Sequence, residues 1–504
     1  AKCNFKSANY INELSIPKKI RSIKIDVHKS GQFNKNFARI VVSKSENIPP
    51  NLKKSFNAKV IINYKFGKCE YKAKIKQTGD WKDHVDFKIG GMPRRSLSLR
   101  LINGNILNAV KFKLLLPETR NNLHEILGSL LIKNVGFIVP ETFQVKTNIN
   151  GSEAIMLFQE DATKEMLERN RRREGPIFEG DENILWSYKN YENFSLEKLS
   201  LARLINKKWF LKGKNAEFIS LNSFIKIQKA FVEYSQNMKI KKQLIIFPNN
   251  LANYSFQEYF LTLLAMNGAH GLRPHNRRFF FNSLSNFFEP IYYDGDLALD
   301  KKGVEFSGHF KIDNDLLKNA FNENFFKNYV NPFINLNNSK KIMAEFQNRV
   351  LVPKHIAKNF YNKALFNVNH NMKELLSRIK SQVSKQVIFS NYISNRKAYL
   401  KKHQLHKIDQ TLISSLVSEK FNYSAKTENG YKLDLTTEDV AEIISKNKFK
   451  NKRTVFLPFP SKYHDNNINQ LRLPETKGGE IIFSDGMKVH INIKQKQITF
   501  LQNS

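Results

Sequence analysis

The stretch from His270 to Asp296, HGLRPHNRRFFFNSLSNFFEPIYYDGD, is the segment around which the rest of the chain is organised. A polar loop with two histidines and Asn276 leads into an aromatic run, and a turn then leads into a second run that stops at Asp294. Such a pattern predicts a β-hairpin. Two carboxylates and an amide beside a strand end are hard oxygen ligands, which Mg²⁺ binds while it keeps positions for phosphate. The stretch therefore predicts metal-assisted phosphoryl chemistry.

The composition indicates a globular, strongly basic protein. The chain has 504 residues, of which 41% are hydrophobic, and this length is typical of about two to four domains. With 82 Lys and Arg against 45 Asp and Glu, the formal charge is +37, which favours anionic partners. The lysines are scattered among Asn and Ile, without a recognisable nucleic-acid module. This pattern disfavours nucleic acid as the main partner and leaves an anionic surface polymer open.

The cysteines and the hydropathy exclude two other classes of protein. Cys3 and Cys69 are far apart and lack metal-ligand spacing, so no zinc site is indicated, while a single disulfide between them stays open. No apolar run approaches the roughly 18 to 20 residues that a membrane-spanning helix needs. The sequence therefore predicts no transmembrane segment.

Strand and helix patterns divide the chain into parts and predict an α+β fold class. Residues 1–57 read as a β-rich leader, in which Ser22–Val27 and Ala38–Val42 alternate like strands. Residues 58–194 read as a sheet-rich lobe with an antiparallel sheet, and residues 195–400 as a helical lobe. Residues 401–504 read as a small α/β appendage. It is expected to contain a short helix at about 438–445 and strands at 454–457, 480–483, 488–491 and 497–500.

Each candidate residue of the opening stretch has a structural and a functional interpretation. In an extended segment, alternate residues such as Asp294 and Asp296 can share one ion, but Asp-Gly is also an ordinary turn. His270 either acts as a general base or positions phosphate, or is a loop histidine bonded to the backbone. Arg273 either grips phosphate oxygens or solvates the surface.

Two acidic segments outside this stretch are further candidates. The loop Gly79–His84 contains Asp80 and Asp83, and its other interpretation is a turn anchored by tryptophan. Glu160 and Asp161 lie where a strand passes into a helix. One of them could pair with a strand cation such as Arg100 or Lys113, as a lysine and a glutamate do when they orient nucleotide phosphates. Asp161 could equally cap the following helix.

These segments together resemble the CotH kinase-like family, in the branch with a Gly-Asp-Trp-x-Asp-His segment. The resemblance covers about Ile75 to Asp296, with the motifs in the same order, and leaves the first part of the chain and everything beyond about Lys302 uncovered. The matching segments are Gly79–His84, Arg95–Arg100, Pro117–Asn121, Asn150–Gly151, Phe158–Glu160, Arg172–Pro176, His270–Asn276 and Glu289–Gly295.

The resemblance implies an atypical protein-kinase-like core that binds ATP with Mg²⁺ or Mn²⁺ and phosphorylates a protein. It implies that Asn276 and Asp294 are the metal ligands, with Asp296 beside them. It also implies that Arg100 stands for the nucleotide-binding base and Glu160 for its acidic partner. The proteins of this family often modify the cell envelope or the spore coat, so an extracytoplasmic location and an envelope-protein or glycan acceptor are expected, while a cytoplasmic location stays open.

One departure concerns the catalytic base. Family members tend to carry an aspartate shortly before the His-Asn pair, whereas Gly268–Leu272 has no carboxylate. His270 could replace it, or Asp80 or Asp83 could supply the acid. The leading hypothesis is a Mg-ATP-dependent phosphotransferase, and the alternative is an inactive kinase-like scaffold that binds acidic polymers.

Overall fold

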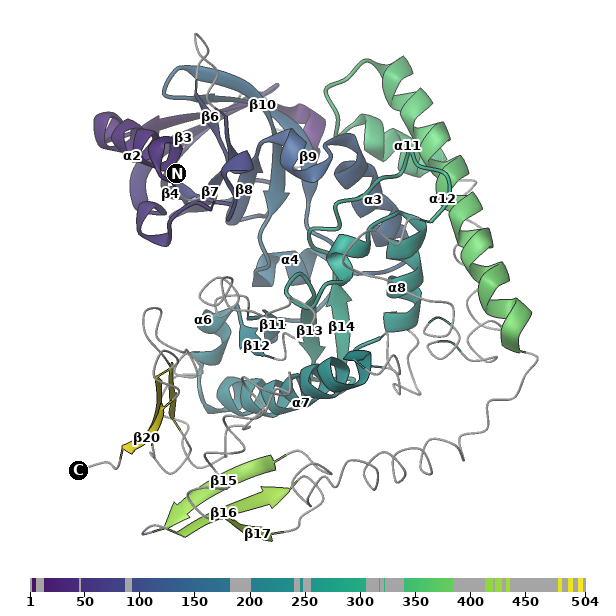
Figure 1. Cartoon of the computed structure of the whole chain (residues 1–504). Helices are drawn as coiled ribbons and strands as arrows, with labels where there is room; N and C mark the ends of the chain where they lie inside the picture. The colour runs from purple at the N-terminus through teal and green to yellow at the C-terminus, as the bar shows by residue number, and fades with distance from the viewer. Residues whose placement is uncertain are drawn as a thin grey trace.

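The structure of the chain is a computed structural model, shown in Figure 1. It describes residues 2–5, 13–44, 47–86, 93–181, 201–239, 245–247, 255–304, 317, 321, 340–383, 413–419, 422–427, 432–435, 479–482, 488–492 and 497–501. The fold mixes α and β structure, as predicted. A sheet built largely from the first 160 residues is followed by a second part with helices around a smaller sheet (Figure 1).

The first sheet closes into a barrel. Within the described residues, eight strands follow the order β1-β4-β3-β2-β9-β10-β8-β7, and β4 also pairs with β7, so the strands other than β1 form a ring. All neighbours are antiparallel except β2 and β9, so the prediction of a purely antiparallel sheet was wrong at this pair. The strands are β1 (Lys2–Phe5), β2 (Ile20–Val27), β3 (Ser55–Tyr64), β4 (Gly67–Gln77), β7 (Leu97–Leu101), β8 (Lys111–Leu115), β9 (Thr142–Ile149) and β10 (Ser152–Glu160).

The two faces of the barrel strands have different surroundings. Alternate side chains point inward, as the two-residue period of a strand requires, and Ile25 and Leu99 are buried there. The outward residues Leu115 and Leu157 belong instead to a second hydrophobic core, which the rest of the molecule shares. Lys113, two residues before Leu115, is therefore on the outer face, where the barrel meets the second part.

The N-terminal residues are part of this barrel. The expected boundary at residue 57 falls inside β3, and β2 pairs with both β3 and β9. The predicted strand at Ala38–Val42 was wrong, because these residues end the helix α2 (Ser30–Val42). Phe33, Phe37 and Ile40 follow the helical spacing and are all buried, so burial of this one face decided the local structure.

A disulfide joins the first strand to the barrel. Cys3 in β1 lies directly opposite Cys69 in β4, and their sulfurs are bonded. The bridge that the sequence left open is therefore present, and it closes a loop between residues that are 66 positions apart.

The second part is built around a four-stranded antiparallel sheet, ordered β12-β11-β13-β14, in the described chain. The predicted hairpin of the opening stretch is confirmed as β13 and β14. Figure 1 shows α12 running beside α8 and α11 along one side of this part. The elements are α3 (Leu123–Asn134), α4 (Lys164–Arg169), β11 (Ile177–Gly180), β12 (Ala202–Leu204), α6 (Lys207–Phe210), α7 (Lys214–Lys239), α8 (Ser255–Ala265), β13 (Arg278–Asn282), β14 (Phe287–Ile291), α11 (Lys340–Gln347) and α12 (Lys354–Val383).

Two small antiparallel sheets are described in the C-terminal segment. Their strands are β15 (Ile413–Glu419), β16 (Asn422–Thr427), β17 (Lys432–Leu435), β18 (Gly479–Ile482), β19 (Lys488–Asn492) and β20 (Gln497–Leu501). The last three match predicted strands. The predicted helix at 438–445 and the predicted strand at 454–457 lie outside the described residues.

Among the helices whose residues are described, none has both the length and the apolar character needed to cross a membrane.

Candidate functional site

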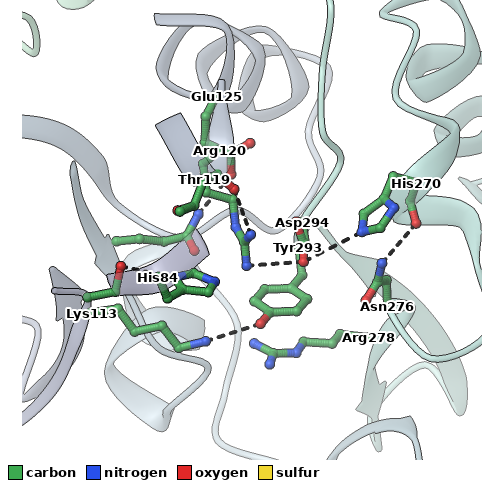
Figure 2. Close-up of polar contacts among 12 residues, drawn as sticks. His84, Lys113, Thr119, Arg120, Glu125, His270, Asn276, Arg278, Tyr293 and Asp294 are labelled. Carbon is green, nitrogen blue, oxygen red and sulfur yellow. Dashed lines mark hydrogen bonds and ion pairs between the residues drawn. The ribbon is translucent and has the colours of Figure 1, made fainter. Parts of the chain in front are cut away.

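Polar side chains from distant parts of the sequence meet where the barrel faces the second part (Figure 2). Lys113 reaches out of β8, and its Nζ lies 3.1 Å from the phenol oxygen of Tyr293, which follows β14. Arg278, at the start of β13, places its guanidinium 3.5 Å from the centre of the Tyr293 ring. The hairpin predicted from the opening stretch thus brings its two ends to the outer face of the barrel.

Asp294 forms the acidic centre of this site. Arg120, at the end of the short 3-10 helix η4 (Pro117–Arg120), places a guanidinium nitrogen 3.0 Å from Asp294 Oδ2. The Nε2 atom of His270 lies 3.8 Å from the same oxygen, too far for a hydrogen bond. Burial would raise the pKa of Asp294, but the positive charge of Arg120 lowers it below its usual value, and the nearby His270 and Lys113 contribute in the same direction. Asp294 is therefore an ionised carboxylate at neutral pH.

The two aspartates of the Asp-Gly-Asp segment have different partners and lie at turns of the backbone. The φ angles of Asp294 and Asp296 are 50° and 49°, so the backbone turns at both residues instead of staying extended. Asp296 is exposed, and its Oδ1 accepts a hydrogen bond of 2.8 Å from Asn121 Nδ2. The extended segment on which the shared-ion expectation rested is therefore absent, and the two carboxylates have different partners.

Asn276 lies beside His270 on the loop before β13. This loop includes the short 3-10 helix η6 (Ala269–Leu272), and Asn276 Nδ2 donates to the His270 carbonyl at 3.1 Å. This bond orients the amide, while Asn276 Oδ1 accepts no hydrogen bond from the described residues. Burial lowers the pKa of His270, so its imidazole is neutral at pH 7. Arg273 lies close enough to lower the pKa of both His270 and His275 further, which places its charge near this loop.

Lys113 has an unusual environment for a lysine. Among the described residues, its ammonium has the Tyr293 phenol as its polar contact and no carboxylate within 4.0 Å. Burial would lower the pKa of Lys113, but Tyr293 and Asp161 outweigh this effect and raise it, so the side chain is charged. Asp161 itself is bound to Lys111 and lies 3.9 Å from Arg278. Lys113 thus presents a positive charge with free N–H donors to the site.

Arg100 and Glu160 do not take the roles expected of them. Arg100 is exposed on the outer face of β7, and its strand neighbours are Lys74 and Lys111. Glu160 has a fully buried side chain that forms an ion pair with Arg169 of α4, away from Lys113. The next residue, Asp161, lies instead beside the cations Lys111 and Arg278. Because neighbouring residues of a strand point to opposite sides, a shift of one position exchanges their roles.

The loop after β4 contributes His84 and Asp83. His84 ends the 3-10 helix η3 (Lys82–His84), and its buried ring enters the site below Arg120 (Figure 2). Asp83 has a pKa raised by burial, although Arg120 opposes the shift. Asp80 forms an ion pair with Lys53, whose Nζ lies 2.5 Å from Asp80 Oδ1, and its charge also acts on His84 and His275.

The buried acid Glu125, on helix α3, lies near Arg120 in the site (Figure 2). Glu125 accepts hydrogen bonds from Tyr292 Oη at 2.5 Å and from Gln159 Nε2 at 2.8 Å. Burial raises the pKa of Glu125 to about 7. Glu125 is thus hydrogen-bonded to two neutral donors. No ion pair between Glu125 and Lys113 is present among the described residues.

The donor set fits Mg²⁺ held together with phosphate better than a metal held by protein alone. The described residues contain no group of three or more His, Cys, Asp or Glu that could hold a metal ion. Asp294 Oδ1 and Asn276 Oδ1 accept nothing from the described residues. Two protein oxygens are a usual contribution to Mg²⁺, which takes its other ligands from water and substrate phosphates.

Sequence reasoning missed several members of the site or gave them no role. Arg120 lies in the Pro117–Asn121 segment of the resemblance, and its signal was its position in a polar turn between a strand and an apolar helix. Tyr293 precedes Asp294 directly, at the end of an aromatic run, and its contact with Lys113 had no signal in the sequence. Nothing in the sequence indicated that Glu125, inside an apolar helical run, would be buried beside Tyr292.

Searches with protein-family models and against curated proteins found no match for this chain.

Proposed function

We propose that this protein is a phosphotransferase with a kinase-like core, which uses Mg-ATP to phosphorylate an envelope protein or a surface glycan. The observation that carries the proposal is Lys113, an ammonium group without a carboxylate partner that faces the same space as Asp294 (Figure 2). A cation in that position is suited to phosphate oxygens. Of the residues that the resemblance implies, Asn276 and Asp294 lie in this site, whereas Arg100 and Glu160 do not.

The residues of the site would have different roles in such a transfer. Lys113 and Arg120 attract the phosphate oxygens, and their charges stabilise the negative charge of the transition state. Asn276 and Asp294 would hold Mg²⁺, which neutralises charge on the phosphates when it is bound. The neutral imidazole of His270 accepts the proton of the attacking hydroxyl as the new oxygen–phosphorus bond forms and ADP leaves.

The disulfide supports an extracytoplasmic location for this activity. Bonds such as Cys3–Cys69 persist in oxidising compartments and are rare in a reducing cytoplasm. An envelope acceptor would be found in such a compartment.

The phosphotransferase proposal is tested by exchanging the two neighbouring aspartates. Asp294→Asn should lower transfer of labelled phosphate from ATP by about 100-fold or more, because a metal ligand and the partner of Arg120 are lost together. Asp296→Asn, which alters an exposed carboxylate held by Asn121, should lower it by less than about tenfold. Full transfer by the Asp294 variant would exclude this role.

A second candidate function is a scaffold that binds polyanions, and it is favoured by the cations outside the barrel. Lys74, Arg100 and Lys111 are direct neighbours across β4, β7 and β8. Lys111 is paired with Asp161, whereas Lys74 and Arg100 form no ion pair among the described residues. Like charges opposite one another are unfavourable unless an anion lies over them. A scaffold would be stabilised by polyanions in a salt-sensitive way and would not respond to the metal-bound nucleotide.

A further inference from the structure

The loop Gly79–His84 carries His84 into the site, although the transfer chemistry above gives this residue no part. We propose that His84 is a fixed neutral hydrogen-bond donor of an oxyanion site, in which its Nε2–H binds a phosphate oxygen beside Lys113 and Arg120. The inference rests on the proposed phosphate position at Lys113, but it concerns binding alone and requires neither metal nor transfer.

The partners of Ser96 fix the position of the proton on the imidazole. Ser96 Oγ accepts a hydrogen bond of 3.0 Å from the Leu116 backbone N–H and lies 2.9 Å from His84 Nδ1. With the Leu116 donor in place, the hydroxyl proton of Ser96 is free to point to Nδ1, which then accepts it. Among the described residues the Ser96 hydroxyl has no other acceptor than Nδ1, so this arrangement places the proton of the neutral ring on Nε2.

The charges around His84 explain why a neutral donor is used. Burial lowers the pKa of His84 to about 3, and the positive charges of Arg120 and Lys113 contribute in the same direction. The ring thus adds a donor beside two cations without adding a third positive charge. No described residue accepts a hydrogen bond from Nε2, so this donor remains available for a ligand.

Gly79 makes room for this arrangement. A Cβ atom at Gly79 would lie 1.9 Å from His84 Cδ2, and the φ angle of Gly79 is +89°, which side chains rarely adopt. Gly79 and His84, the first and last residues of the segment, are therefore packed against each other. Only a residue without a side chain allows the backbone to lie this close to the imidazole ring.

The geometry selects the chemical class of the ligand. Two cations and a neutral N–H donor converge from β8, η4 and η3, which suits an anion with several acceptor oxygens. A phosphate or polyphosphate group has such oxygens, whereas a halide offers one acceptor atom to all three donors.

Two substitutions that differ in the position of their amide test the inference. The amide nitrogen of His84→Gln reaches the place of Nε2, whereas that of His84→Asn reaches only the place of Nδ1. Binding of tripolyphosphate is measured by calorimetry in EDTA, without added metal. Wild-type protein and His84→Gln should bind with affinities within about threefold of each other, and His84→Asn about tenfold more weakly, since a hydrogen bond to a charged group is lost.

A control variant separates this effect from the general cost of replacing a buried histidine. His124 also lies in a partly buried place, where its Nδ1 accepts the Leu299 N–H at 2.9 Å. His124→Asn should bind tripolyphosphate like the wild-type protein.

Three results would overturn the inference: no tripolyphosphate binding by the wild-type protein, wild-type affinity in His84→Asn, or equal weakening in both His84 variants. Polyphosphate binding that depends on His84, without any transfer from ATP, would leave the inference standing and contradict only the proposed transfer.

Discussion

Lys113 is the residue on which the nucleotide proposal depends most directly. Its ammonium faces Tyr293 and has no carboxylate within ion-pair distance in the described structure, so a phosphate would supply its missing partner. Lys74, on the same outer face of the barrel, is exposed and lies outside the site. The two lysines therefore form a matched pair for mutation.

Lys113→Met should weaken Mg-ATP binding by about tenfold to 100-fold, because it removes a charged donor to phosphate. The free energy of unfolding should change by less than about 1 kcal/mol, since methionine is similar in length and no ion pair is lost. Lys74→Met serves as the control and should leave the affinity unchanged. Calorimetric titration measures the affinity, and equal affinities in the two variants would contradict the assignment.

Single residues also show where sequence reasoning reached its limit. Asn276, Asp294 and His270 were named from the sequence, and the structure brings them together. Arg100 and Glu160, which the resemblance implied, lie outside the site. Lys113 and Asp161, which the sequence left open as alternatives to them, lie in it or at its edge. A resemblance places a segment, whereas the pleat of the strand decides which of its residues faces the site.

At the scale of elements, the hairpin β13–β14 was predictable because its two aromatic runs flank a turn. Helix α2 was not predicted, because the short alternation at Ala38–Val42 masked the longer spacing of Phe33, Phe37 and Ile40. The turn at Asp294 was one of two interpretations of the same dipeptide. Local patterns of a few residues are compatible with more than one structure, and tertiary packing selects among them.

Helix α3 provides a prediction about pH. Burial raises the pKa of Glu125 to about 7 from an ordinary value of 4.5, so the folded protein keeps a proton that the unfolded chain has lost. The contribution of Glu125 to stability should therefore fall as the pH rises from about 4.5 to about 7 and then level off. The buried His84 and His275, whose pKa values are lowered to about 3 and about 4, contribute in the opposite direction. The contribution of Glu125 is on the order of 3 kcal/mol. Urea unfolding at a series of pH values measures it.

Glu125→Gln should remove this component of the pH dependence. The amide keeps the size of the side chain and still accepts a hydrogen bond from Tyr292, but it does not titrate. The difference in unfolding free energy between wild-type and variant protein should then grow in favour of the variant from pH 4.5 to pH 7. A constant difference across this range would show that Glu125 does not retain its proton in the folded state.

At the scale of the whole molecule, closure of the barrel positions the site. The β4–β7 pairing and the parallel β2–β9 pairing join segments that are distant in sequence, and no local pattern indicates either of them. The site forms because the outer face of β8 and β10 packs on the second core, which brings Lys113 to a residue 180 positions later. The mixed α and β composition was predictable, whereas this docking depends on long-range packing.

The most direct test of the central claim is calorimetric titration of the wild-type protein with ATP, in Mg²⁺ and in EDTA, followed by a polyanion without nucleotide. Our account predicts one nucleotide site whose affinity is at least about tenfold higher with Mg²⁺, because Asp294 and Asn276 then bind the metal that joins them to the phosphates. Binding of polyanions alone, with no response to ATP in either condition, would contradict it.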